Sequence, residues 1–179
     1  MTRMSTIDIA SATGLTAELF TNIKRSVGKV PNAYASIGSQ SPVVLQSLLA
    51  TNAALKSSGA LSAKELEAIN IAISENSGCD YCLAAHTLTG KMAGYTPEQI
   101  RELRAGGLST DQKIDALVKF VLKLVRTAGT VPQSVLDGVR EAGYSDTQVT
   151  EAILAVTAIL TTNLFNRVND TILDFPSAK

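Results

Sequence analysis

Two cysteines and one histidine lie within eight residues of this chain, in the segment CDYCLAAH at residues 79–86. The 179-residue sequence contains no other cysteine or histidine. Thiolates are the nucleophilic and redox-active form of cysteine, and histidine is the side chain that exchanges protons near neutral pH. Because the chain gathers all its groups of these two types in one short segment, we predict a chemical site there.

A helix through this segment would place Cys79, Cys82 and His86 on one face. Each helical residue advances about 100°, so the three side chains fall within an arc of roughly 60°. Cys79 would lie in the first turn, where unpaired amide N–H groups and the helix dipole favour a thiolate. Cys82 would have His86 one turn further on. These electrostatic arguments alone leave open which cysteine has the lower pKa.

A carboxylate in the preceding segment is placed to assist the histidine. Glu67 adjoins the apolar run AINIAI at residues 68–73, so we expect it to be partly buried, with its pKa raised towards the range of a general base. If two helices fold back on each other at Gly78, Glu67 and His86 lie level within about one helical turn, roughly 5 Å. The sequence therefore predicts a proton relay from Cys82 through His86 to Glu67.

Capping signals with glycine and proline punctuation divide the chain into roughly eight predicted helices, and no alternating apolar pattern indicates a strand. Ser62, Thr96 and Ser145 are each followed three residues later by Glu or Gln, the spacing of a capping box. We predict one all-α domain over residues 1–179, in which an antiparallel helical hairpin carries the core motif, residues 61–93. The predicted helices span approximately residues 17–27, 42–57, 62–76, 79–93, 96–106, 110–127, 132–142 and 145–173.

Composition narrows the class of function. Sixteen basic and sixteen acidic residues give a formal charge of zero, so no global field attracts nucleic acid or an anionic membrane. The N-terminus lacks the pattern of a secretory signal, and Thr157 interrupts the longest apolar stretch, residues 152–160, so we predict no membrane span. We expect a cytoplasmic protein. In a reducing compartment, a close cysteine pair favours catalysis or metal binding over a structural disulfide.

The spacing of Glu67, Cys79, Cys82 and His86 resembles the core motif of the alkyl hydroperoxidase D (AhpD) proteins, within the carboxymuconolactone decarboxylase superfamily. The resemblance covers most of residues 30–170. It implies an all-α, AhpD-like helical bundle that forms trimers or hexamers and needs no cofactor. Further segments that are similar to the larger members of the superfamily are residues 30–32, 41–42, 61–62, 76–78 and 163–167.

The resemblance also implies catalytic roles. Cys82 would attack a hydroperoxide and become a sulfenic acid, and Cys79 would condense with it to form a disulfide. Glu67 and His86 would deprotonate Cys82 through a water, so we predict a lowered pKa for Cys82. A dihydrolipoyl group on a partner protein would reduce the disulfide. Tyr81 departs from the best-known hydroperoxidases, which carry a second histidine there, and this departure predicts a slower relay or a different substrate.

Three other functions stay open. Decarboxylases and lactone-processing members of the superfamily generally lack the cysteine pair, so the cysteines favour the redox branch. A zinc ion held by Glu67, Cys79, Cys82 and His86 would be the main alternative site, although structural zinc usually takes ligands from two separated knuckles. The chain could also be a helical assembly module whose thiols only sense oxidation. A c-type haem would need histidine where Leu83 stands.

The end of the last predicted helix carries polar residues with two readings. Asn163, Asn166 and Arg167 could line a pocket or a subunit interface, or could lie on a solvated helix end. The sequence alone does not choose between these readings.

Overall fold

Nine α-helices and one short 3₁₀ helix make up the regular structure of residues 2–178, the part of the chain that the computed structural model describes. No strand occurs in that part, so the predicted all-helical fold is confirmed. The elements in chain order are η1 (Ile9–Ser11), α1 (Gly14–Val27), α2 (Asn32–Gln40), α3 (Pro42–Ser58), α4 (Ala63–Asn76), α5 (Asp80–Met92), α6 (Pro97–Ala105), α7 (Gln112–Arg126), α8 (Gln133–Glu141) and α9 (Asp146–Asn169).

The central helix α4 is apolar on nearly every side because other helices surround it. It packs against α5, α6, α7 and α9, and its residues Ala68, Ile69, Ile71 and Ile73 are inaccessible to solvent. The capping box predicted at Ser62 is present, since Glu65 Oε2 accepts the Ser62 amide N–H at 2.7 Å. This cap sets the start of α4 and therefore the register in which Glu67 faces the next helix.

Helix α2 was not expected from the sequence. Its residues, NAYASIGSQ, include Gly, Ser and Asn, which are weak helix formers. The helix is stabilised by packing instead, because Ala33, Ala35 and Ile37 are buried. A Cβ placed on Gly38 would lie 2.6 Å from Phe20 Cε1 and 2.8 Å from Leu45 Cδ2. Gly38 thus allows α2 to approach its neighbours closely.

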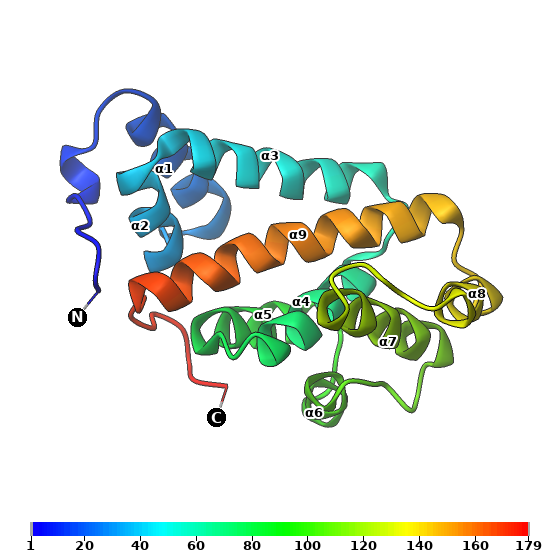
Figure 1. Cartoon of the computed structure of the whole chain (residues 1–179). Coiled ribbons are helices and arrows are strands. Elements are labelled where there is room, and N and C mark those ends of the chain that lie inside the picture. The colour runs from blue at the N-terminus through cyan, green and yellow to red at the C-terminus, as the bar shows by residue number, and fades with distance from the viewer. Residues whose placement is uncertain (1, 179) are drawn as a thin grey trace.

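The long helix α9 lies between α3 and the group formed by α4, α5 and α7 (Figure 1). It ends at Asn169, earlier than the predicted end near residue 173, because Asp170 adopts a left-handed conformation with φ 54°. Within residues 2–178 it is the one helix long and apolar enough to cross a membrane by length and composition. The prediction that no segment meets this test is therefore wrong, although the face of α9 that carries Asn163, Asn166 and Asn169 is buried against the other helices.

Replacing Gly38 by Ala should destabilise the protein. The added methyl group would overlap buried carbon atoms of Phe20 and Leu45, and overpacking of this kind typically costs about 1–3 kcal/mol of unfolding free energy. Gly138 in α8 is the matched control, because its added Cβ meets no atom within 4 Å and Ala is the better helix former. Urea unfolding should show a loss for G38A and no loss for G138A, and equal stabilities would contradict the packing argument.

Candidate active site

Helices α4 and α5 run antiparallel and are joined by a short turn. Gly78 in this turn has a φ of +63°, a left-handed conformation that glycine adopts without steric cost. The Tyr95 hydroxyl, just beyond α5, donates to the carbonyl of Lys64 near the start of α4 at 2.9 Å. This hydrogen bond joins the end of α5 to the beginning of α4. Residues that are far apart in the sequence of the hairpin therefore lie beside each other.

Glu67 and His86 contact each other directly across this pair of helices. His86 Nδ1 lies 2.8 Å from Glu67 Oε2, and the Thr89 hydroxyl donates to the same oxygen at 2.7 Å. The side chain of Glu67 is 17% exposed and that of His86 is 23% exposed. Because a carboxylate only accepts, the Nδ1 hydrogen faces Glu67 and the other ring nitrogen, Nε2, is the one available for proton exchange.

The pKa of Glu67 is lowered, so the prediction of a raised pKa is wrong. Burial does raise it, but the charge of His86 and hydrogen bonds from His86, Thr89 and Asn70 together have the larger effect. Glu67 is therefore an ionised partner that orients the imidazole, and it is unsuited to accept a proton near neutral pH.

Both cysteines are free thiols and lie almost wholly inside the protein, with exposures of 2% for Cys79 and 3% for Cys82. Cys79 is the N-cap residue of α5, and its Sγ accepts the backbone N–H of Cys82 at 3.3 Å. The side chain of Cys82 also donates its hydrogen to Cys79. The two thiols are therefore hydrogen-bonded to each other in a site with little access to water.

The two thiols differ in pKa, in the order opposite to that predicted. The pKa of Cys79 is lowered by the hydrogen bond from the Cys82 side chain, against the effect of burial, and further by the Cys82 backbone N–H and the charges of His86 and Arg167. The pKa of Cys82 is raised by its bond to Cys79, by burial and by the charge on Cys79. A thiolate is therefore favoured on Cys79 over Cys82.

Helix α9 adds two residues whose role the sequence left open. Asn166 is buried, and its Nδ2 donates to Cys82 Sγ at 3.3 Å. Arg167 donates to the carbonyl of Ser77 in the turn before Cys79. The reading of a solvated helix end is therefore wrong for Asn166, which contacts a sulfur atom from a position 84 residues away in sequence.

Tyr81 takes part in packing and in anchoring the C-terminal segment. Its hydroxyl donates to Asp174 Oδ1 at 2.6 Å and accepts the Ala33 backbone N–H at 3.1 Å. Its ring meets Phe175 edge-on at 5.6 Å between centroids. Lys29 also binds Asp174, with Nζ 2.8 Å from Oδ2. Tyr81, at the position where the best-known hydroperoxidases carry a second histidine, thus makes structural contacts.

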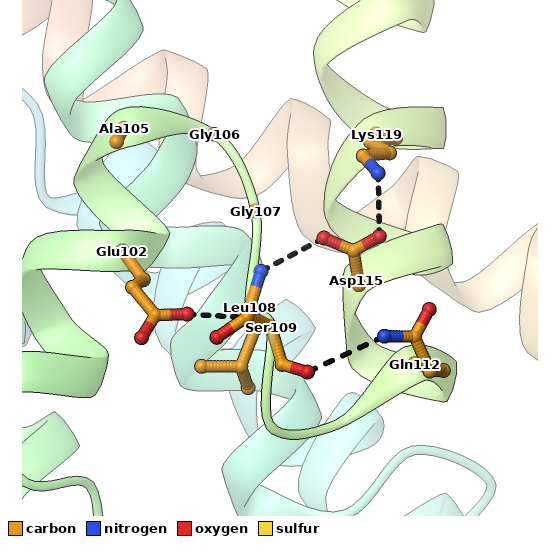
Figure 2. Close-up of a pocket in the computed structure, with 9 residues that line it drawn as sticks. All are labelled: Glu102, Ala105, Gly106, Gly107, Leu108, Ser109, Gln112, Asp115 and Lys119. Carbon is orange, nitrogen blue, oxygen red and sulfur yellow. Dashed lines mark hydrogen bonds and ion pairs between the residues drawn. The ribbon is translucent and has the colours of Figure 1, made fainter.

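A surface hollow between α6 and α7 is separate from this site (Figure 2). Its polar groups bind one another: Asp115 accepts the Leu108 N–H at 2.8 Å and pairs with Lys119, and Glu102 accepts the Ser109 N–H. Neither cysteine lines it. Among residues 2–178, no group of three or more His, Cys, Asp or Glu side chains is arranged to hold a metal ion.

Part of the chain is similar in sequence to a known family and to a known protein. Residues 42–122, which include the hairpin, match the carboxymuconolactone decarboxylase family. An uncharacterized protein from Haemophilus influenzae is 32% identical over 68 residues, which are 38% of this chain. The matched part spans 60% of the length of that relative.

Two solved structures share the fold over nearly the whole chain. One is an AhpD-core, peroxidase-related protein from Ralstonia eutropha JMP134, with a TM-score of 0.86, 19% identity and coverage of 97% of this chain and 92% of that one. The other is the debrominase Bmp8 in complex with 2,3,4-tribromopyrrole, with a TM-score of 0.79, 15% identity and coverage of 97% and 92%. The family match covers the hairpin region, and the solved structures show that the chain shares its fold with an uncharacterized, peroxidase-related protein that has an AhpD core.

The Glu67 ion pair predicts a pH-dependent stability. Because the pKa of folded Glu67 lies below its ordinary value of 4.5, the carboxylate stabilises the folded state above that pH, and the contribution is lost as the pH falls through the lowered pKa. Replacing Glu67 by Gln should cost about 1–2 kcal/mol at neutral pH and flatten this acid decline.

Urea unfolding at several pH values measures this effect. Glu18→Gln, at an exposed position on α1, is the control and should keep the decline of the wild type. A Glu67→Gln protein that loses stability in acid as steeply as the wild type would rule out the proposed contribution of the ion pair.

Proposed function

We propose that the protein is a thiol-dependent peroxidase, an oxidoreductase that reduces organic hydroperoxides or hydrogen peroxide through Cys79 and Cys82. The observation that carries this proposal is the buried pair of free thiols, which are hydrogen-bonded to each other near the His86–Glu67 ion pair. Such a pair combines a thiol of lowered pKa, Cys79, with a second thiol beside it, and a two-cysteine peroxidase requires both a stabilised thiolate and a partner thiol.

The first chemical step begins when Cys79, the thiol of lowered pKa, has ionised and its thiolate takes the proton of Cys82. The Cys82 thiolate then attacks the terminal oxygen of the hydroperoxide ROOH, and the O–O bond breaks. A proton delivered by the imidazole of His86, which Glu67 holds in orientation, converts the leaving alkoxide to the alcohol ROH. Cys82 is left as a sulfenic acid, oxidised by two electrons.

The second step closes the cycle. The Cys79 sulfur attacks the sulfenic sulfur of Cys82, water leaves, and a disulfide forms. A dithiol must then return two electrons and two protons. We propose a dihydrolipoyl group on a partner protein as this reductant. A narrow, flexible dithiol suits sulfur atoms that are at most 3% exposed, because a bulkier donor would need a larger opening of the fold.

A second candidate function is reductive debromination, which is favoured by the fold shared with Bmp8. A thiolate would take bromine from a brominated aromatic ring, which gains a proton, and the second cysteine would displace bromide to form the same disulfide. The same two sulfur atoms and the same dithiol reductant serve both reactions. A parallel assay with 2,3,4-tribromopyrrole distinguishes the substrates.

The peroxidase mechanism predicts which intermediate can be trapped. After one equivalent of tert-butyl hydroperoxide, a Cys79→Ser protein should carry a sulfenic acid on Cys82, because the resolving thiol is missing. Dimedone labelling with mass spectrometry detects it. Both Cys79→Ser and Cys82→Ser should lose steady-state hydroperoxide consumption with dihydrolipoamide. A Cys82→Ser protein that is oxidised at Cys79, beside a Cys79→Ser protein that stays reduced, would reverse the roles.

We also propose that the protein is a cytoplasmic homo-oligomer, a trimer or hexamer. Support comes from α9, which exposes Leu154, Leu164 and Val168 on its outer face, and from Ile172 just beyond it. Apolar side chains gathered in this way are typical of protein contact surfaces. A cytoplasmic location suits two thiols that must be reduced to act.

Light scattering tests the oligomer. We expect a mass of three or six times 18.8 kDa at micromolar concentration, and a smaller mass for Leu164→Lys, which places a charge on the exposed face. Lys91→Ala, on the exposed part of α5, is the control and should keep the wild-type mass. A wild-type protein that stays at 18.8 kDa would contradict the proposal.

A further inference from the structure

The buried amide of Asn166 is only half satisfied. Asn166 is 4% exposed, and its Nδ2 donates to Cys82 Sγ at 3.3 Å, yet its Oδ1 is buried with no hydrogen-bond partner among residues 2–178. Leaving such an acceptor unpaired is energetically unfavourable. A side chain with a purely structural role would be expected to satisfy both ends, as its neighbour Asn163 does with Ser74 and the carbonyl of Ile73.

Asn166 is also the donor best placed to act on Cys82. Hydrogen bonds from Asn166 and Thr162 both lower the pKa of Cys82, and that from Asn166 has the larger effect. The Thr162 hydroxyl, one turn earlier on α9, also donates to the Ile159 carbonyl at 2.9 Å. The backbone N–H of Cys82 is directed to Cys79, and the charges of His86 and Arg167 favour a thiolate on Cys79. The amide of Asn166 is therefore the stronger of the two side-chain donors that oppose this bias.

We propose that Asn166 is a catalytic residue that stabilises the thiolate on Cys82 and thereby selects this sulfur as the nucleophile of the pair. The inference rests on the proposed thiol chemistry and adds the group that decides between two hydrogen-bonded sulfur atoms. When the proton passes from Cys82 to Cys79, the Nδ2–H bond to Cys82 becomes charge-assisted and strengthens. The amide thus stabilises the arrangement that reacts more than the arrangement at rest.

The unpaired Oδ1 of Asn166 can accept a hydrogen bond after Cys82 has attacked the hydroperoxide. Amide oxygen and nitrogen share one carbon, so Oδ1 lies less than about 6 Å from Cys82 Sγ. Oxidation turns Cys82 into S–O–H, which brings a hydroxyl donor into a pocket where a buried acceptor has none. Accepting this hydrogen would satisfy Oδ1 and hold the sulfenic oxygen on the side of Asn166 until water leaves.

Competitive alkylation tests the selection of the sulfur without requiring peroxide turnover. Each reduced protein receives less than one equivalent of iodoacetamide near neutral pH, and mass spectrometry gives the ratio of Cys82 to Cys79 modified. In Asn166→Leu, which keeps the branching of the side chain and removes both polar atoms, this ratio should fall at least about tenfold, because a hydrogen bond to a charged group is lost.

Asn163→Leu is the matched control, since it removes a buried amide from the same helix without touching a sulfur, and its ratio should equal that of the wild type. Asn166→Asp decides the question if the Leu variant does not fold, as judged by circular dichroism, because it keeps the shape and replaces the donor by an acceptor. An unchanged ratio in the folded Asn166 variant overturns the inference, as does an equal fall in Asn163→Leu.

A parallel hydroperoxide assay separates the two proposals. If the wild type consumes hydroperoxide while the alkylation ratio does not respond to Asn166, the peroxidase function stands and the role of Asn166 is wrong. If the ratio falls as expected while the wild type consumes no hydroperoxide, Asn166 does select the nucleophilic sulfur and the substrate proposed for that sulfur is wrong.

Discussion

The hydrogen bond between Cys79 and Cys82 is the interaction on which the rest of the site depends. The two sulfur atoms are 2% and 3% exposed, and an isolated thiolate in a region that water hardly reaches would be strongly unfavourable. A thiolate on Cys79 is favoured because it would accept hydrogen bonds from the Cys82 side chain and backbone N–H and would lie near the positive charges of His86 and Arg167. Cys82 and His86 come from α5, and Arg167 comes from α9.

Three elements must meet for this arrangement to form. Helix α4 carries Glu67, helix α5 carries the cysteines and His86, and helix α9 carries Asn166 and Arg167. The apolar residues of α4 stabilise the contact among the three helices, and the polar residues on their inner faces then have few partners except one another. The packing of the three helices therefore both buries these polar residues and brings them into contact with one another.

The place of Tyr81 bears on how this chain differs from the best-known hydroperoxidases. The ring is held by Asp174, Ala33 and Phe175, so the position that would carry a second histidine joins α5 to α2 and to the C-terminal segment. Solved structures that share this fold include an uncharacterized, peroxidase-related protein with an AhpD core and the debrominase Bmp8.

The sequence alone predicted what depends on local spacing. Capping boxes placed the starts of α4, α6 and α9, and the intervals between Glu67, Cys79 and His86 predicted a hairpin in which acid and imidazole meet, because helical geometry converts a residue count into a position. Helix α2 was not predicted, because it contains weak helix formers and is stabilised instead by burial around Gly38.

Only the tertiary structure decided the electrostatics. The pKa of Glu67 depends on the balance between burial and the bonds it receives, and the order of the cysteine pKa values depends on which sulfur donates the shared hydrogen. Asn166 reaches Cys82 from 84 residues away, a contact that no local pattern contains. Spacing along a helix is a property of the chain, whereas desolvation and charge at a buried sulfur arise only when distant segments enclose it.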